Sequence, residues 1–367
     1  MKRRGLLTPL LGAVLLSLAP GVAAQVETAV ERLNRELTDG VVVPAYQRFA
    51  TDGAALETAI GAFCAAPTPA RLAAARQAFA AAMDAWQAVQ PIGFGPVRSG
   101  GLAAVVQLFP DRRDAVGRQL NRALAAMDPA LVAPGGLAGK SIALTGFPAL
   151  ERILFDDARV PLAATTPATA YACAFARAVA RNLAGIAADL LDQWQRPGGF
   201  RAVVLSAAGG NDVYYDAEEV AGDLLQSLHG ALDLAIAAKL EPALGATPED
   251  ARPKRLESWR SALSLANLRA NLSTARALYE ADGGFGELLA ARGGGEDLDR
   301  EIRQTFARIF TLLDGIDAPL AVALAAPGPR TEVLKLLAEL KALRQRVRAK
   351  LAPALGLLIG FNATDGD

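Results

Sequence analysis

The stretch of this chain with the most potential for chemistry is Gly146-Phe147-Pro148-Ala149-Leu150-Glu151, which places a carboxylate about one helical turn after a proline. A carboxylate in that position accepts hydrogen bonds from the amides at the start of its own helix, or it faces a pocket and binds a cation or a basic group of a ligand. The residues alone leave both interpretations open.

Two other segments gather Gly, Pro and charge at the ends of predicted helices. The turn Gly93-Phe94-Gly95-Pro96 follows one helix, and Phe109-Pro110-Asp111-Arg112 opens another with an acid near its positive end. Each segment taken alone is typical of a tight corner. Together with Glu151, the two segments indicate a ligand site more strongly than any one of the three does alone.

The common hydrolytic mechanisms find little support. His229 is the only histidine, so zinc ligation by several imidazoles is impossible, and the HExxH pattern is absent. His229 lies on the flank of an apolar stripe, which favours a packed residue over a catalytic one. Gly139-Lys140-Ser141 looks like the end of a P-loop, but the first glycine of that pattern would fall on Pro134.

The first residues are typical of an export signal. Lys2, Arg3 and Arg4 precede a short apolar run, and Val22-Ala23-Ala24 offers small residues for cleavage near Ala24. We therefore expect residues 1–24 to be a signal peptide and the mature protein to be periplasmic. No later stretch is apolar for long enough to be transmembrane.

Composition favours helices and argues against nucleic-acid binding. Hydrophobic residues make up 52% of the chain but aromatic residues only 6%, and the surplus is mostly alanine, the best helix former. The 38 basic and 38 acidic residues balance, and without the three basic residues of the signal peptide the acids are in slight excess. Such a chain has no basic footprint for nucleic acid.

Proline and glycine divide the chain into predicted helices. Thr68-Pro69 begins a helix that reaches about Gln90, and Thr166-Pro167 begins one that stops at Pro197. Asp212 is expected to cap a later helix. The short β-branched runs at 41–43 and 202–205 have no convincing partner strand.

The chain is predicted to be all-α, with two related helical bundles formed by residues 25–196 and 212–367. A weak similarity between the two halves of the sequence suggests duplication. Each half has a predicted helix with a central tryptophan, Trp86 or Trp259, followed later by a Gly-Phe-X-Ala element. These elements are Gly146-Phe147-Pro148-Ala149 and Gly360-Phe361-Asn362-Ala363.

Two cysteines, Cys64 and Cys173, occur in the mature chain. In an oxidising compartment an even number of thiols indicates a disulfide. The alternative is two separate buried thiols.

Several motifs together resemble the imelysin-like family, in order and over nearly the whole mature chain. They are the GFGP turn at 93–96, FPDRR at 109–113, GFPALERILF at 146–155, YEADGGFG at 279–286 and GFNATDGD at 360–367. In the GxHxxE signature of that family, Gly146 and Glu151 match the glycine and the acid, while Pro148 replaces the histidine. Proline offers no metal ligand, so a His-plus-Glu metal pair cannot form.

The resemblance implies a ligand site between the two halves and a link to iron uptake, with iron or another divalent or trivalent metal as ligand. Glu151 would supply a carboxylate, Arg112 would meet an anionic part of the ligand, and Phe94 and Phe147 would form the walls. The expected site comprises Phe94, Gly95, Pro96, Asp111, Arg112, Gly146, Phe147, Pro148 and Glu151, with Glu151 as the expected metal ligand.

The expected function is that of a non-enzymatic ligand-binding or metal-binding component of iron uptake, with an iron-uptake or envelope protein as partner. The alternative is an imelysin-type peptidase, the activity that the family name implies. No activated water or nucleophile can be assembled from these residues.

Overall fold

The computed structural model describes residues 27–157, 162 and 166–358, and every regular element within these ranges is a helix. The all-α prediction is therefore confirmed, and the β-branched runs at 41–43 and 202–205 lie in helices. The predicted signal peptide and the Gly360-Phe361-Asn362-Ala363 element lie outside the described residues.

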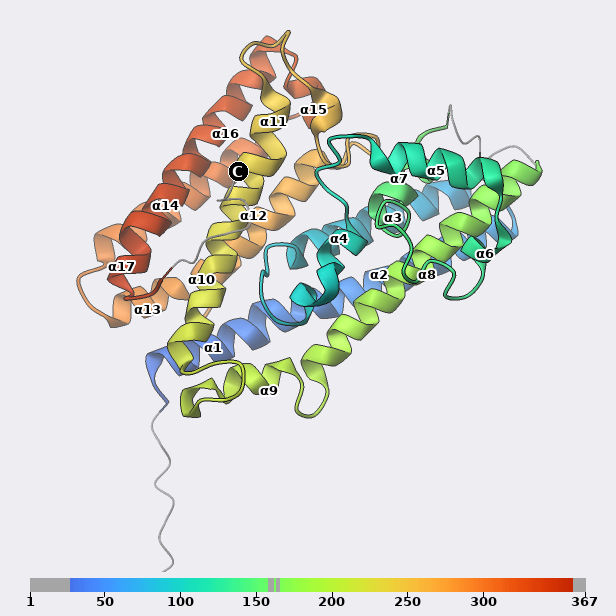
Figure 1. The fold of residues 1–367 in the computed structure, drawn as a ribbon. Coiled ribbons are helices and arrows are strands. Elements are labelled where there is room, and N and C mark those ends of the chain that lie inside the picture. Colours follow the sequence, from blue (N-terminus) through green and yellow to red (C-terminus); the bar gives the residue numbers. More distant parts are fainter. Residues whose placement is uncertain (1–26, 158–161, 163–165, 359–367) are drawn as a thin grey trace, which may run out of the picture.

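The first group of helices is built from three long elements packed side by side, with shorter helices around one face (Figure 1). The long helices are α2 (Val43–Ala65), α3 (Pro69–Val89) and α8 (Pro167–Gln195). The shorter ones are α4 (Leu102–Val106), α5 (Ala115–Ala126), α6 (Pro129–Val132), α7 (Phe147–Phe155) and α9 (Phe200–Leu205), with the 3₁₀ segments η2 (Gly95–Gly101) and η3 (Ala207–Gly209).

The second group contains four long helices, α10 (Ala217–Asp233), α12 (Ser264–Glu280), α14 (Glu296–Asp314) and α16 (Pro327–Arg346). Short helices connect or end them: α11 (Glu241–Leu244), α13 (Phe285–Ala291), α15 (Leu320–Ala323) and α17 (Ala352–Ala354). The 3₁₀ turn η5 (Pro253–Arg255) and the π-helical segments η4 (Leu234–Leu240) and η6 (Val347–Leu351) complete this group.

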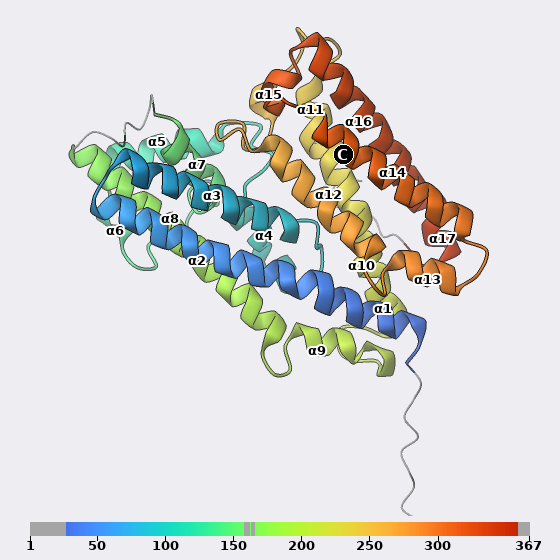
Figure 2. The same ribbon diagram turned by 180° about the vertical axis from the view of Figure 1, so that it is seen from behind.

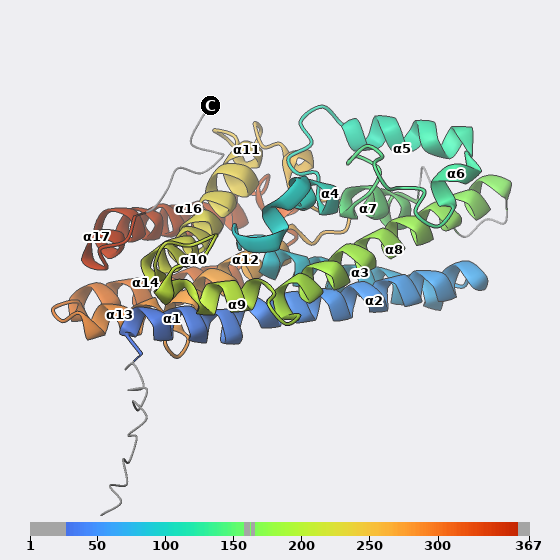
Figure 3. The ribbon, with the colours of Figure 1, turned by 60° about the horizontal axis from the view of Figure 1, so that its bottom comes forward.

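The first helix joins the two groups. Helix α1 (Ala29–Leu37) continues through the π-helical segment η1 (Thr38–Val42) into α2, and Figures 2 and 3 show one long rod that runs along both groups. Helix α1 packs against α10 and α13, whereas α2 packs against α3 and α8. One continuous cluster of buried apolar residues extends through both groups. The duplication of the two halves stays a prediction.

The predicted helix starts at Thr68 and Thr166 are confirmed, since each threonine side chain accepts a hydrogen bond from the third helical amide. The predicted cap at Asp212 is wrong. Helix α10 is capped by Asp216, whose Oδ1 accepts from the amide of Glu219 at 3.0 Å. Asn211 displaces the start because its side chain accepts from the amides of residues 213 and 214 and holds them in a turn.

The predicted disulfide is confirmed, because Cys64 in α2 is bonded to Cys173 in α8 with their Cα atoms 5.6 Å apart. The bond ties the far ends of two helices that already pack along their lengths. None of the helices in the described ranges is long and apolar enough to cross a membrane.

Candidate ligand site at the seam between the helix groups

The interface between the two helix groups is lined by polar side chains, and we call this row the polar seam. It is formed by α3 and α7 of the first group and by η4, α12 and the loop at 256–263 of the second. At its centre lies an ion pair between Lys239 and Glu257, whose Nζ and Oε2 atoms are 2.8 Å apart. Both side chains are almost completely buried. Burial lowers the pKa of Lys239, and the adjacent Glu257 carboxylate partly opposes that shift.

Lys239 uses all three of its donors. Besides Glu257, its ammonium donates to Gln87 Oε1 at 2.5 Å and to Asn271 Oδ1. Glu257 Oε2 also accepts from Asn267 Nδ2 at 2.7 Å. The second oxygen, Glu257 Oε1, is buried and has no hydrogen-bond partner in the described part of the chain. An unpaired buried acceptor is rare in native proteins and indicates a place where water or a ligand donor binds.

Amide side chains extend this network into α3. Asn271 donates to the carbonyl oxygen of Gln87 at 2.7 Å, which joins α12 to α3. Gln107 Oε1 accepts from Trp86 Nε1 at 2.6 Å and from Gln87 Nε2 at 3.0 Å. The central tryptophan of α3 therefore takes part in the polar seam as well as in the apolar core.

Glu151 also crosses the seam, and it binds the facing loop rather than the amides at the start of its own helix. Its Oε1 accepts from the backbone amide of Ser261 at 2.9 Å and from the Ser261 hydroxyl at 2.7 Å. It therefore does not cap α7, so that interpretation is wrong. The side chain is 5% exposed. Burial raises the pKa of Glu151, and the hydrogen bonds from Ser261 offset only part of the increase.

Charged groups continue the seam beyond Glu151. Arg152 is buried and pairs with Asp114, which precedes α5. Across the seam Arg260 stacks over the ring of Trp259, with its guanidinium carbon 4.2 Å from the ring centroid. Burial and the repulsion of Arg152 lower the pKa of Arg260, although Glu151, Asp156 and Asp114 act in the opposite direction. No salt bridge holds Arg260 in the described ranges.

The loop at 256–263 was expected to be helical, and that prediction is wrong. Helix α12 begins only at Ser264, so Trp259 does not lie in the middle of a helix. Its position therefore does not correspond to that of Trp86. Ser258 and Ala262 have φ values of +50° and +58°, which are strained for residues other than glycine. Asp114, on the facing side, has φ of +50°. Strain of this kind collects at functional sites, where the surrounding structure compensates for it.

The GFGP turn, which carries three of the predicted site residues, contacts α10 of the second helix group. The amide of Gly93 donates to Ser227 Oγ on α10 at 3.3 Å. Phe94 and Pro96 are buried, and the ring of Phe94 packs edge-on against Trp194 with centroids 5.8 Å apart. Gly95 has φ of +73°, and an added Cβ there would lie 2.9 Å from Trp194.

The remaining predicted residues surround the start of α5 and α7. Asp111 accepts from the amides of Ala115 and Val116 at 2.8 and 2.9 Å, which are the first two amides of α5, while Arg112 is exposed. Phe147 is fully buried and its ring packs on Phe79.

Gly146 and Pro148 hold α7 in place. At Gly146 an added Cβ would lie 2.2 Å from the carbonyl oxygen of Val106. This position therefore requires glycine. Pro148 stands at the second position of α7, where a missing amide hydrogen leaves no helical bond unmade.

The candidate site, as far as the structure describes it, lacks a set of side chains that could hold a metal ion. Within the described ranges, no three His, Cys, Asp or Glu residues converge in a way that could hold one. Oε1 of Glu151 is occupied by Ser261, and the positive charge of Arg260 acts on this carboxylate, which disfavours an added cation. Two hollows are found elsewhere on the surface, and neither is lined by the predicted site residues.

The single histidine is packed, as the sequence predicts. His229 is 5% exposed, and its Nδ1 lies 3.1 Å from Asp233 Oδ2 on the same helix. Asp233 is in turn paired with Arg344 of α16 at 2.9 Å. These two contacts lower the pKa of Asp233 against the opposing effect of its burial. The group joins α10 to α16 within the second helix group.

Sequence reasoning missed Lys239, Glu257, Asn271 and Arg260. Lys239 interrupts an otherwise apolar run from Leu234 to Leu240, and a charged residue in such a run is a sequence sign of a buried polar contact. The π-helical turns of η4 shift the register of the side chains, so a helical wheel does not place Lys239 at the interface. Glu257 and Arg260 carry no comparable signal, because their burial depends on the irregular loop.

Comparisons with known proteins agree with this architecture. The family model described as Imelysin matches residues 42–347. Iron-regulated protein A of Synechococcus elongatus is 28% identical over 323 residues, which cover 86% of this chain and 84% of that protein.

Two solved structures share the fold. The structure of an imelysin-like protein from Psychrobacter arcticum has a TM-score of 0.74 at 19% identity and covers 91% of this chain and 98% of its own. A putative iron-regulated protein A precursor from Parabacteroides distasonis has a TM-score of 0.73 at 17% identity, covering 90% and 97%. Because the family model matches most of the length of this chain, the chain belongs to the imelysin family.

Proposed function

We propose that this protein is an exported, non-enzymatic binding protein of iron uptake, and that it binds an anionic iron chelate at the polar seam beside Arg260. The observation that carries the proposal is the geometry of Arg260, whose guanidinium stacks over the ring of Trp259 at 4.2 Å and has no salt bridge in the described ranges. Glu151, Asp156 and Asp114 already oppose the repulsion between Arg260 and Arg152, so an anion would bind there through direct hydrogen bonds from the Arg260 guanidinium.

The surroundings of Arg260 suit a chelate with carboxylate groups better than a bare ion. A guanidinium presents several donors in a plane, which match carboxylate oxygens. The adjacent Trp259 offers a half-buried ring against which a ligand could pack, and Lys254 adds a cation 5.8 Å from the centroid of that ring. The metal would then be held by the chelator, in keeping with the absence of a ligand cluster among the described side chains.

Glu151 has a positioning role in this proposal. By binding Ser261, Glu151 fixes the loop that carries Trp259 and Arg260. Its carboxylate therefore positions the residues that would contact the ligand, without contacting the ligand itself. Arg112 is exposed and two residues from Asp114, where it can meet an anionic part of the ligand.

The link to iron rests on the relatives, whose names describe them as iron-regulated. Export rests on the basic and apolar residues at the start of the sequence. We therefore place the protein in the periplasm, where it would pass its ligand to a partner protein of the envelope.

Tryptophan fluorescence gives a direct test. Trp86 and Trp194 are fully buried and Trp259 is half-exposed, so a chelate beside Arg260 should quench mainly Trp259. Ferric citrate is the first probe, with iron-free citrate and ferric, ferrous, copper and zinc ions as comparisons. We expect saturable quenching by ferric citrate, loss of that signal in Trp259→Phe, and at least tenfold weaker binding in Arg260→Gln.

Arg276→Gln is the matched control, since Arg276 also stacks on an aromatic ring, 3.9 Å from the centroid of Phe310, and that ring belongs to α14, which is not part of the polar seam. Unchanged affinity in Arg260→Gln, or no saturable binding of any probe, would refute the proposal. The peptidase alternative is tested by incubation with an unfolded protein substrate. Cleavage that is sensitive to a chelator and lost in Glu151→Gln would replace our proposal with that activity.

A further inference from the structure

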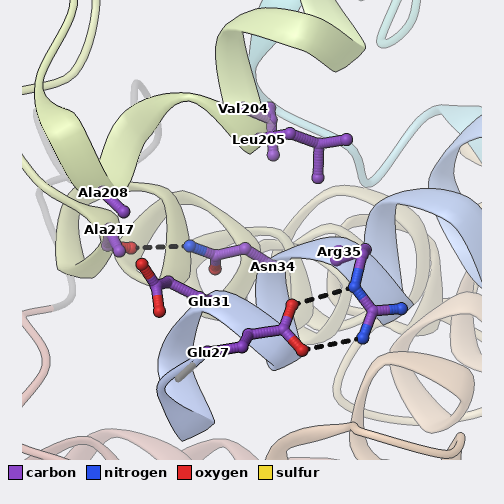
Figure 4. A pocket seen from close by; sticks show the side chains of 8 residues that line it. All are labelled: Glu27, Glu31, Asn34, Arg35, Val204, Leu205, Ala208 and Ala217. Carbon is purple, nitrogen blue, oxygen red and sulfur yellow. Dashed lines mark hydrogen bonds and ion pairs between the residues drawn. The ribbon is translucent and has the colours of Figure 1, made fainter. Parts of the chain in front are cut away.

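A second site lies far along the rod from the Cys64 end, where α1 meets α9, η3 and the first residue of α10. The structure has a hollow of about 230 Å³ there, which we call the α1 hollow (Figure 4). It is lined by Glu27, Glu31, Asn34, Arg35, Val204, Leu205, Ala208 and Ala217. One wall is polar and belongs to α1 and the residues before it, and the other is apolar and belongs mainly to α9 and η3.

The floor of the α1 hollow contains an unpaired polar atom. Asn34 is 2% exposed, and its Nδ2 donates to the carbonyl oxygen of Ala217 at 2.8 Å. Its Oδ1 is buried and has no hydrogen-bond partner in the described part of the chain. Because buried amide oxygens are almost always paired, this atom points to a donor that comes from outside the chain.

The charge of the α1 hollow favours a cationic donor. Glu27 is neutralised by Arg35, which binds both of its carboxylate oxygens at 2.9 Å. Glu31 has no cationic partner in the described ranges. Its Oε2 accepts from the amide of Thr28 at 2.5 Å, and its Oε1 accepts no hydrogen bond there. The hollow thus presents one uncompensated negative charge near one unpaired amide oxygen.

The acceptors that are not engaged select the type of cation. Asn34 Oδ1 and Glu31 Oε1 are single acceptors on different side chains. The three donors of an ammonium group diverge and can reach separate acceptors, whereas a guanidinium fork is matched by the two oxygens of one carboxylate. The one carboxylate with such a geometry, Glu27, is already bound by Arg35.

The apolar wall selects what the ammonium is attached to. Val204, Leu205 and Ala208 can cover the methylene groups of an alkyl chain, in the way that lysine stems pack on apolar surfaces. The volume of the α1 hollow is several times that of a water molecule and below the range of roughly 300–1,000 Å³ of pockets for drug-sized ligands. It therefore suits one side chain or a small amine.

We propose that the α1 hollow binds the ammonium group of an alkylamine, either a lysine side chain of a peptide or a free diamine. The ammonium would donate to Asn34 Oδ1 and Glu31 Oε1, while its alkyl chain would lie against Val204 and Leu205. This site is separate from the polar seam, so its success or failure does not depend on the proposed function.

The test is titration of the full mature protein, followed by NMR of the Asn34 side-chain amide. The probes are N-acetyl-lysine methylamide, N-acetyl-arginine methylamide and cadaverine. We expect a saturable shift with the lysine probe or with cadaverine, and weaker binding of the arginine probe. The two amine probes distinguish a peptide source from a free amine.

Glu31→Gln is the decisive variant, because glutamine can still complete the cap with Thr28 and the helix start is retained. We expect it to bind the amine probes at least tenfold more weakly. Glu339→Gln is the control, since it makes the same change of charge at an ion pair on α16. Absence of a saturable shift, equal affinity in Glu31→Gln, or tighter binding of the arginine probe would overturn the proposal.

Discussion

Replacement of Lys239 by methionine is the most informative perturbation of the polar seam. Methionine keeps the length and most of the volume of the side chain but removes the charge and all three donors. Glu257 would then be a buried carboxylate with one hydrogen bond, from Asn267, and no countercharge. Gln87 Oε1 and Asn271 Oδ1 would each lose the ammonium that they accept from.

The expected effect on stability follows from burial. Removing one partner of a buried ion pair reduces the free energy of unfolding by about 3–5 kcal/mol, because the other charge stays desolvated. The two amide oxygens that lose their donor add to this, while the apolar methionine side chain subtracts from it. We expect Lys239→Met to destabilise the protein by about 4 kcal/mol.

The chain offers a matched control in Lys335→Met. Lys335 pairs with Glu332 at 2.8 Å, the same distance as between Lys239 and Glu257. The side chain of Lys335 is 58% exposed, however, against 3% for Lys239. Exposed pairs of this kind contribute at most about 0.5 kcal/mol on helices. Equilibrium unfolding in urea, followed by circular dichroism, compares the two variants.

The reasoning would be refuted if Lys239→Met cost less than about 1 kcal/mol, as an exposed pair does. A double variant, Lys239→Met with Glu257→Met, tests the cause. If the uncompensated charge dominates, the double variant should be more stable than Lys239→Met by at least about 2 kcal/mol. A double variant that is less stable than the single one would show that lost packing was responsible.

Three further predictions concern single positions. Cys64→Ser opens a loop with a sequence separation of 109 residues and should lower stability by about 4.7 kcal/mol in the chain-entropy model, measured by denaturant unfolding without reductant. Gly146→Ala should cost about 1–3 kcal/mol or more, measured in the same way, because the new Cβ meets the carbonyl oxygen of Val106. Since the folded-state pKa of Glu151 is raised above its ordinary 4.5, the folded protein binds more protons than the unfolded chain between the two values. The unfolding free energy should therefore fall as pH rises through that window, and Glu151→Gln should flatten this part of the profile; an unchanged slope in the variant would contradict the assignment to Glu151.

Much of the fold could be predicted from the sequence because local signals and tertiary packing agree. Threonine followed by proline marked the starts of α3 and α8 correctly, since a capping oxygen and a fixed φ act within one turn. The start of α10 was placed four residues early, because Asn211 binds local amides in a turn that competes with a helix start.

The candidate site was less predictable, because its residues are buried by an irregular loop. The apolar spacing of Leu256, Trp259 and Leu263 imitates a helix, but Ser258 and Ala262 adopt positive φ values that no pattern of apolar residues reveals. Glu151 stood out in the sequence by its motif. Its partner Ser261 did not, since a serine 110 residues away gives no local sign of a contact.

The composition of the polar seam is hard to explain by stability alone. Well-packed apolar residues in place of a buried ion pair are often neutral, or stabilising by about 1–4 kcal/mol. Here the chain instead buries Lys239 and Glu257, leaves Glu257 Oε1 unpaired and holds Ser258 and Ala262 in strained conformations. All of these features lie in one interface, within the same loop or directly against it. Since the apolar core extends through both helix groups without them, these features support the proposal that the loop presenting Trp259 and Arg260 binds a ligand.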